Sequence, residues 1–278
     1  LPFLALACPL DAAPLHRHGS SWRCAAGHSF DIAAQGYANL LPVQRKRSRD
    51  PGDSKEMVAA RRRFLNAGHY QPIAAAVSRV ALADTAAGAT ISCLDAGCGE
   101  GYYLRQLAAA AGDDQMLALL GLDISKWAVL SAAKQDKRPN WIVGSNANLP
   151  VQPGTLDLVL CMFGFPVYGE FARVLKPSGV LLQVDAGPDH LRELREIIYP
   201  ALKPERPADA QLPEGFCFLS TETVRFPLAI DGAEQIADLL AMTPHLYRAS
   251  AEGRARAAAL VSLALTVDVR LTRFGRVA

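Results

Sequence analysis

The sequence has no long uninterrupted hydrophobic run, although 50% of its 278 residues are hydrophobic. Its alanine-rich stretches, at 77–89 and 255–265, are short or interrupted by polar residues, whereas a membrane-spanning helix needs roughly 18 to 20 apolar residues. The first residues, 1–7, are apolar, but no basic segment precedes them and no clear cleavage site follows, which is unlike a secretory signal. We therefore expect no membrane span and predict a cytoplasmic protein.

Cysteine is scarce, and acidic and basic residues nearly balance. Four of the six cysteines lie in or near segments predicted to be buried strands, so we expect reduced thiols rather than disulfides. The net charge is +2, but residues 1–80 hold eleven Lys and Arg against five Asp and Glu, which leaves 18 against 22 in the rest. A basic N-terminal third suits a module that faces a polyanion, although a solvated basic surface would have the same composition.

Short apolar runs alternate with amphipathic helical patterns from about residue 90 onward. Strands are predicted at 91–95, 116–123, 141–144, 156–162 and 180–184, and helices at 102–111, 126–135 and 168–175. Strands that alternate with helices form a mostly parallel sheet covered on both faces. The predicted fold class is therefore α/β, a Rossmann-like, doubly wound, mostly parallel sheet.

The flanking segments complete this outline. Ser54 is the predicted N-cap of a helix that runs to about Asn66, and Gly68 would end it. After the alternating series we expect a loop at 200–215, a strand near 223–230, a helix near 233–242 and a final edge strand at 261–274. Residues 1–40 have few periodic apolar positions, so we expect this module to be held by something other than a core. A basic linker with helices at 41–84 would join it to a catalytic domain at 85–278.

A glycine-rich loop, LDAGCGEG at 94–101, follows the first strand of the series. Gly97, Gly99 and Gly101 allow backbone amides to approach a ligand closely at the start of a helix. Dinucleotide sites use G-x-G-x-x-G, whereas this loop is G-x-G-x-G, with Asp95 before it and Glu100 within it. That spacing favours S-adenosylmethionine. The alternative is a purely structural turn, but the strand before the loop and the helix after it match the context that the motif requires.

Polar residues also follow the next two strands. Asp123, at the end of the second strand and followed by Ile124, is placed to accept both ribose hydroxyls of an adenosine. Its alternative role is a helix N-cap, for which Ser125 is better suited. The segment at 145–150 follows the third strand, where Asn146 is placed to bond the adenine amino group, unless the segment is simply a loop.

Four potential metal ligands occur near the N-terminus. Cys8, Asp11, Cys24 and His28 have the spacing C-x2-D-x12-C-x3-H, in which two knuckles suit a tetrahedral structural zinc. His16 and His18 lie between the knuckles and are alternative ligands. A catalytic zinc is disfavoured because no Glu is close by to act as a general base. The remaining alternative is that these residues are scattered in a surface segment.

These segments, with RVLKPSG at 173–179 before a strand, resemble the Rossmann-like methyltransferase superfamily. Many of its members carry an acid where this chain has Ser145. More specific short sequence segments, spread over nearly the whole chain, resemble those of the 23S ribosomal RNA (guanine-N1)-methyltransferase family. They include FD at 30–31, GYANLLPVQ at 36–44, KRSRDPGDS at 46–54, RRRFL at 61–65, GHYQP at 68–72, YY at 102–103, GP at 187–188, HL at 190–191 and MTP at 242–244.

The resemblance implies an N-terminal zinc-ribbon for RNA recognition, methyl transfer from S-adenosylmethionine to N1 of a guanine in a 23S rRNA hairpin, and a homodimer. It places the zinc ligands on Cys8, Asp11, Cys24 and His28, with Asp11 where the family has a third cysteine. It adds cofactor contacts at Tyr70 and His190, which motif logic alone does not find. The predicted cofactor-binding set is then Tyr70, Asp95, Gly97, Gly99, Glu100, Gly101, Asp123, Ile124, Asn146 and His190.

RNA binding would draw on basic and aromatic side chains. The candidate phosphate contacts are Arg45, Lys46, Arg47 and Arg49. The alternative is that this stretch is a solvated linker. The residues that could stack on unpaired bases are Trp22, Phe30 and Tyr37. The alternative is that these aromatic side chains form the core of the small module.

Methylation at N1 also requires an unpaired guanine and the removal of its N1 proton. Asp185, Asp189 and His190 are candidate general bases by their place at the end of the fifth strand, although Asp185 equally suits a strand-end cap and His190 a cofactor contact. Two rival functions are a small-molecule methyltransferase of the quinone or sterol type and a zinc-dependent RNA-binding protein without activity. The metal-binding basic N-terminus argues against the first, and the intact glycine loop against the second.

Overall fold

The structure is a computed structural model, and it describes residues 1–45, 48, 50–83, 88–112, 115–201 and 212–277. Most of the predicted loop at 200–215 lies outside these residues, as do three of the four candidate phosphate contacts, Lys46, Arg47 and Arg49. Arg45 ends the short 3-10 helix η1, Val43–Arg45. A phosphate-binding role for this basic stretch therefore stays a prediction.

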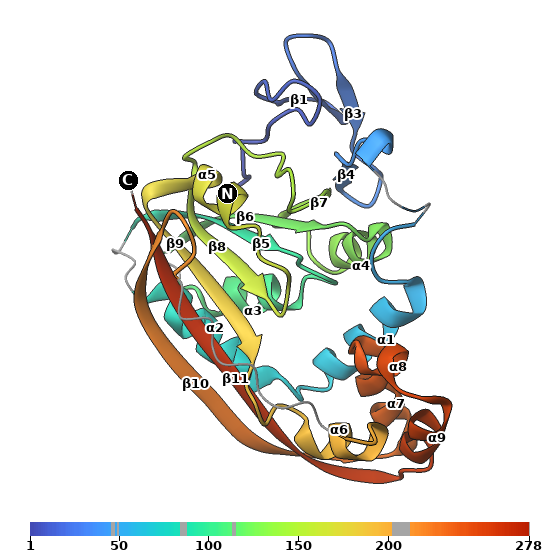
Figure 1. The fold of residues 1–278 in the computed structure, drawn as a ribbon. Coiled ribbons are helices and arrows are strands. Elements are labelled where there is room, and N and C mark those ends of the chain that lie inside the picture. The colour runs from blue at the N-terminus through green and yellow to red at the C-terminus, as the bar shows by residue number, and fades with distance from the viewer. Residues whose placement is uncertain (46–47, 49, 84–87, 113–114, 202–211, 278) are drawn as a thin grey trace.

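An eight-stranded sheet forms the centre of the molecule (Figure 1). Its strands are β4 Tyr37–Asn39, β5 Thr90–Ala96, β6 Met116–Asp123, β7 Asn140–Val143, β8 Leu156–Met162, β9 Leu175–Ala186, β10 Phe216–Asp231 and β11 Ser262–Arg276. They lie in the order β10-β11-β9-β8-β5-β6-β7-β4. Only the two pairings made by β11 are antiparallel. The predicted α/β, Rossmann-like, doubly wound, mostly parallel sheet is confirmed.

The last strand corrects one prediction. The segment at 261–274 was expected to be a final edge strand, but β11 lies between β9 and β10, and β10 forms the edge. Alternate residues of β11, such as Leu265 and Val267, are buried, which shows that this strand belongs to the covered part of the sheet. The sequence period predicts a strand but not its neighbours, because the order depends on how the chain returns through the helices that follow β10.

Helices cover both faces of the sheet. They are α1 Lys55–Asn66, α2 Gln71–Leu82, α3 Tyr102–Ala110, α4 Lys126–Gln135, α5 Tyr168–Val174, α6 Arg192–Ile198, α7 Ala233–Met242, α8 His245–Arg248 and α9 Ala251–Ala258. Helices α2, α3 and α4 contribute to the core on one face, and α5 to the core on the other. Ser54 caps α1 as predicted, since its hydroxyl accepts the Met57 N–H at 3.3 Å. Among the described residues, no helix has both the length and the apolar character needed to cross a membrane.

The N-terminal segment is joined to the large sheet. Strands β1 His16–His18, β2 Ser21–Arg23 and β3 Ser29–Asp31 form a small antiparallel sheet, at the top of Figure 1. The next strand, β4, pairs in parallel with β7 at the edge of the large sheet. Residues such as Phe3, Leu6 and Trp22 are buried in the same core as Leu94 of β5.

This shared core corrects the expectation that the N-terminal segment is held by something other than a core. The described chain forms no helix between β7 and β8, and the N-terminal residues cover that part of the sheet instead. Leu6 forms a β-bridge with Val151, and the Ala7 N–H donates to the Pro150 carbonyl at 2.9 Å. The packing of the N-terminal residues on the large sheet could not be predicted from the sequence, because the apolar residues at 3–22 follow neither a helical nor a strand period.

Trp141 fixes the glycine loop against the sheet. Its side chain is 1% exposed, and its indole N–H donates to the Asp136 carbonyl at 2.8 Å. The ring fills the space beside two glycines. A methyl group at Gly101 would lie 2.5 Å from the ring, and one at Gly121 of β6 would overlap it. Neither position leaves space for a larger residue.

We therefore expect Gly121→Ala to lower the free energy of unfolding by roughly 1–3 kcal/mol, because the added methyl group overpacks the core. The matched control is Gly169→Ala in α5, where a methyl group meets nothing within 4 Å and a helical alanine is favourable. Urea denaturation followed by circular dichroism measures both variants. Equal midpoints for Gly121→Ala and the wild type would contradict this role of Trp141.

Candidate functional site

The glycine loop crosses from β5 to α3 at the carboxyl edge of the sheet. Gly97, Gly99 and Gly101 have positive φ angles of 98°, 55° and 81°, a region that favours glycine. The N–H groups of Gly97 and Cys98 donate to the Leu122 carbonyl at 2.8 and 2.9 Å, which fastens the loop to the end of β6. A side chain at Gly97 would meet nothing within 4 Å, whereas Gly101 is packed on Trp141. The loop thus has an open side at Gly97 and a packed side at Gly101.

Asp123 ends β6 beside this loop. Its Oδ2 accepts the Gly99 N–H at 2.9 Å, and its Oδ1 accepts the Ser125 N–H at 2.8 Å. The alternative role as an N-cap falls to Ser125, whose hydroxyl accepts the Ala128 N–H at 3.2 Å and caps α4. Burial raises the pKa of Asp123. Its carboxylate is thereby held rigidly next to Gly99, with lone pairs left for the hydroxyls of a ligand.

Asp95, in β5, is the most unusual group of the site. It is fully buried, and neither of its carboxylate oxygens has a hydrogen-bond partner among the described residues. Burial, together with the nearby charge of Asp123, raises the pKa of Asp95 to about 8. The side-chain oxygen of Asn146 is likewise buried without a partner, while its amide N–H donates to the Ala96 carbonyl at 3.3 Å.

These unpartnered acceptors test whether S-adenosylmethionine fits the residues present. Buried polar atoms are normally paired, so a group of free acceptors points to a ligand that supplies donors or positive charge. S-adenosylmethionine carries an ammonium, a sulfonium and an adenine amino group. Asp95 and Asn146 match these groups in chemistry, and Asp123 matches the ribose hydroxyls. The donor and acceptor set of this edge fits the cofactor.

Glu100 differs from its neighbours in the loop. Its carboxylate is buried and binds the Arg105 guanidinium at 2.9 and 3.0 Å and the Gln135 amide at 2.5 Å. These contacts join the loop to α3 and α4. Because both oxygens are occupied, a cofactor contact of Glu100 would fall to its backbone rather than to its side chain.

Tyr70 and His190 meet on the same edge although 120 residues separate them in the sequence. The Tyr70 hydroxyl lies 3.3 Å from His190 Nε2, and His190 Nδ1 accepts the Asp268 N–H at 3.3 Å. Burial lowers the pKa of His190 to about 4, so the ring is neutral near pH 7. The proton of the neutral ring then sits on Nε2, since Nδ1 is an acceptor. Both nitrogens are engaged, which suits positioning better than general-base chemistry.

The two carboxylates named with His190 differ in their surroundings. Asp189 pairs with Arg225 at 2.7 Å and Arg192 at 3.2 Å, and these guanidinium groups lower its pKa, which weakens it as a base. Asp185 is half-buried and accepts the Gln183 amide at 2.7 Å, and burial raises its pKa. A raised pKa strengthens a carboxylate as a base.

A wall formed by α1 and the turn before it closes the site beside Asp123. The Ser125 hydroxyl donates to the Asp53 carbonyl at 2.7 Å, and a side chain at Gly52 would clash with Ile124. Arg61 of α1 pairs with Asp53, donates to the Met242 carbonyl at 3.0 Å and lies next to Gly99. Motif logic missed Asp53 and Arg61 as site residues. The only indication in the sequence was that both residues lie in segments that resemble the family, 46–54 and 61–65.

The four predicted metal ligands come together in the N-terminal segment. The donor atoms of Cys8, Asp11, Cys24 and His28 all lie within 4.8 Å of one another. His28 Nδ1 is 3.4 Å from each sulfur and 3.1 Å from Asp11 Oδ2. A tetrahedral zinc with bonds of about 2.0–2.3 Å requires donors at roughly these separations. The other Asp11 oxygen accepts the Ala13 N–H at 3.0 Å, which orients Oδ2 toward the centre.

The other candidate residues of the N-terminal segment lie outside the cluster of metal ligands. His16 and His18 lie in β1 with exposed side chains and are not among the converging donors. Trp22 and Tyr37 are buried, as the core alternative predicted, and Phe30 is half-buried. All six cysteines are free thiols.

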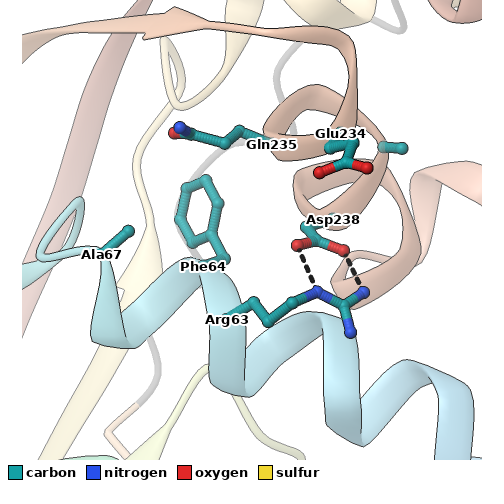
Figure 2. Close-up of a pocket in the computed structure, with 7 residues that line it drawn as sticks. Arg63, Phe64, Ala67, Glu234, Gln235 and Asp238 are labelled. Carbon is teal, nitrogen blue, oxygen red and sulfur yellow. Dashed lines mark hydrogen bonds and ion pairs between the residues drawn. The ribbon is translucent and has the colours of Figure 1, made fainter.

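A cavity of about 490 Å³ lies between α1 and α7 (Figure 2). Its lining residues are Arg63, Phe64, Ala67, Glu234, Gln235, Ala237 and Asp238. Figure 2 shows the Arg63 guanidinium paired with the Asp238 carboxylate, with 2.8 Å between Nε and Oδ2. None of the predicted site residues lines this cavity. It is therefore a junction between two helices, and the cofactor candidates lie elsewhere, at the carboxyl edge of the sheet.

Comparisons with known proteins agree with both parts of this description. Residues 6–49 match the family model described as RlmA, N-terminal, and residues 93–179 match a methyltransferase domain. Among solved structures, a Bacillus halodurans protein shares 14% identity with a TM-score of 0.46, over 72% of this chain and 99% of that one. The fold assignment rests instead on the strand order described above.

Three relatives are similar in sequence. The 23S rRNA (guanine(748)-N(1))-methyltransferase of Streptomyces fradiae is 37% identical over 68% of this chain and 66% of its own length. Two further relatives have names that contain the words 23S rRNA (guanine-N(1)-)-methyltransferase. One is a Micromonospora griseorubida protein, 36% identical over 97% of this chain and 96% of that protein. The other is a Bacillus subtilis protein, 30% identical over 96% and 95%. Identity of this extent shows that the chain belongs to the 23S rRNA (guanine-N1)-methyltransferase family.

Proposed function

We propose that this protein transfers a methyl group from S-adenosylmethionine to N1 of a guanine in a 23S rRNA hairpin. The observation that carries the proposal is the unpartnered carboxylate of Asp95 beside Asp123, in a chain that aligns with its relatives over nearly its whole length. Such an edge suits a cationic adenosine compound, and the names of the relatives give the class of acceptor.

The proposed cofactor contacts divide by chemistry. Asp123 accepts the ribose hydroxyls, Asn146 the adenine amino group and Asp95 the ammonium group. The backbone of the loop, next to Ile124, approaches the ligand through Gly97, Gly99 and Glu100, and Gly101 holds the loop in place on Trp141. Tyr70 and His190 border the same edge and, through their hydrogen bond, keep each other in place.

The reaction asks little of the protein beyond position and proton removal. S-adenosylmethionine supplies a methyl group on a positively charged sulfur, and a site that excludes water can align it with the acceptor nitrogen. The N1 proton of guanine must leave to a base or to solvent. Of the named candidates, Asp185 has a pKa that burial raises, which favours it as a base, whereas His190 has both nitrogens engaged.

The proposal extends to the rest of the chain. Residues 1–40 would act as an RNA-recognition zinc-ribbon, 41–84 as a basic linker with helices, and 85–278 as the S-adenosylmethionine-dependent domain. Zinc would be held by Cys8, Asp11, Cys24 and His28, whose donors converge as a structural site requires. The family resemblance supports a homodimer, and ribosomal RNA as substrate supports action in the cytoplasm.

Primer extension on ribosomal RNA tests the activity directly, because a methyl group at guanine N1 blocks base pairing and stops the polymerase. We expect one stop in 23S rRNA that disappears in a strain without this protein and returns when the wild-type chain is supplied. Asp123→Ala should fail to restore it, since S-adenosylmethionine affinity should fall roughly 10- to 100-fold without the carboxylate. A stop that persists unchanged in the strain without the protein would overturn the proposal.

Metal analysis tests the zinc site. We expect one zinc per wild-type chain and less than one after Asp11→Ala, because a site with two thiolates and one imidazole binds more weakly than a complete set of four. Asp11→Cys should retain zinc against a competing chelator at least as well as the wild type. The matched control is Asp31→Ala, which removes the same charge from β3 outside the centre. Full zinc retention by Asp11→Ala would show that Asp11 is not a ligand.

A further inference from the structure

Phe163 follows β8 in an unusual backbone conformation. Its φ angle is 52°, in the left-handed region that bulky side chains rarely adopt, and such strain is commonly kept at functional sites. The conformation is held by the Phe163 N–H, which donates to the Val184 carbonyl at 2.8 Å. Leu191, next to His190, is another non-glycine residue with a positive φ, 51°. Phe163 and the residue that follows His190 thus both have a positive φ, close to the point where the Phe163 and His190 rings meet.

The Phe163 ring is backed by buried aromatic groups on one side. It stacks on His190 with a centroid distance of 5.9 Å and an interplanar angle of 24°, and the Tyr70 ring lies 6.4 Å away. Tyr70 is 3% exposed and His190 9%, whereas Phe163 is 39% exposed. An apolar ring is thus held against a rigid support with a large part of its surface open to solvent.

The ring also lies beside the proposed cofactor contacts. A side chain at Gly164 would meet the Ala96 carbonyl at 3.7 Å, and that carbonyl accepts the Asn146 amide N–H. Ala96 directly follows Asp95, so the turn that presents Phe163 touches the end of β5. The turn that carries the exposed ring thus adjoins the groups that would hold the methyl donor.

We propose that the exposed surface of the Phe163 ring stacks on the guanine base that receives the methyl group. The inference rests on the proposed function. A guanine whose N1 is paired must leave its duplex before it can react, and it then loses the stacking of its neighbours. An aromatic ring restores that stacking for any base, and a ring fixed by a strained backbone holds the base in one plane. His190 acts here as a positioning residue, because it supports the ring from behind.

The test uses a hairpin transcript that carries the guanine identified by primer extension. We expect Phe163→Leu and Phe163→Gly to lower kcat/KM for this hairpin roughly 5- to 100-fold, the loss that removal of one base–aromatic stack produces. Phe163→Tyr, which keeps the ring, should stay within about 2-fold of the wild type. Glycine suits a positive φ, so Phe163→Gly removes the ring with little risk to folding. The matched control is Phe165→Ala, since Phe165 is 87% exposed and lies only two residues away.

A second hairpin, with an abasic residue in place of the guanine, separates stacking from general damage. Phe163→Leu should bind the guanine hairpin more weakly than the wild type does, but should bind the abasic hairpin equally well. Its affinity for S-adenosylmethionine should be unchanged. A weaker affinity for the cofactor would place the ring against the cofactor instead, and wild-type kcat/KM in Phe163→Leu would show that no stack exists. Either result would overturn this inference while wild-type methylation continued, whereas a wild-type protein that methylates no hairpin would overturn the proposed function itself.

Discussion

The site depends on a buried carboxylate, that of Asp95, which has no hydrogen-bond partner among the described residues. Asp95 sits inside the sheet, and the charge of Asp123 at the end of the next strand adds to the cost of ionising it. Such a group destabilises the folded chain when it is charged, which favours its protonated form as long as no cation is bound beside it. The tight glycine loop, the Trp141 ring against it and the pairing of Glu100 with Arg105 supply rigidity around this point. A positively charged ligand would supply the partner that the Asp95 carboxylate lacks among the described residues.

The N-terminal segment is fixed to the large sheet. Because β4 extends the large sheet and Leu6 pairs with Val151, the proposed zinc-ribbon is anchored to the catalytic domain at two places. The four converging donors hold its two knuckles together, while the buried Trp22 ties them to the core beneath. An RNA that bound this segment would therefore be held in a defined position relative to the large sheet rather than through a loose tether.

Much of this arrangement could be predicted from the sequence, because short-range patterns determine it. The period of the apolar residues predicted β6, β8, α4 and α7 at the residues observed, and Ser54 marked the start of α1. The spacing of the metal ligands also predicted their convergence. The order of β10 and β11 could not be predicted, since it depends on contacts between distant segments. No local pattern in the sequence indicated Phe163 either, because its contacts with Val184 of β9 and with His190 join segments that are distant in the sequence.

The central claim is that the edge at Asp95 receives a cationic cofactor, and calorimetry of S-adenosylmethionine binding tests it most directly. With a pKa of about 8, Asp95 is mostly protonated at pH 7, and a bound cation should ionise it. Titrations at pH 7 in phosphate and in Tris, which differ in ionisation enthalpy, count the protons released. The account predicts close to one proton per site for the wild type and none for Asp95→Asn. Identical binding enthalpies in the two buffers for the wild-type protein, or no binding at all, would contradict it.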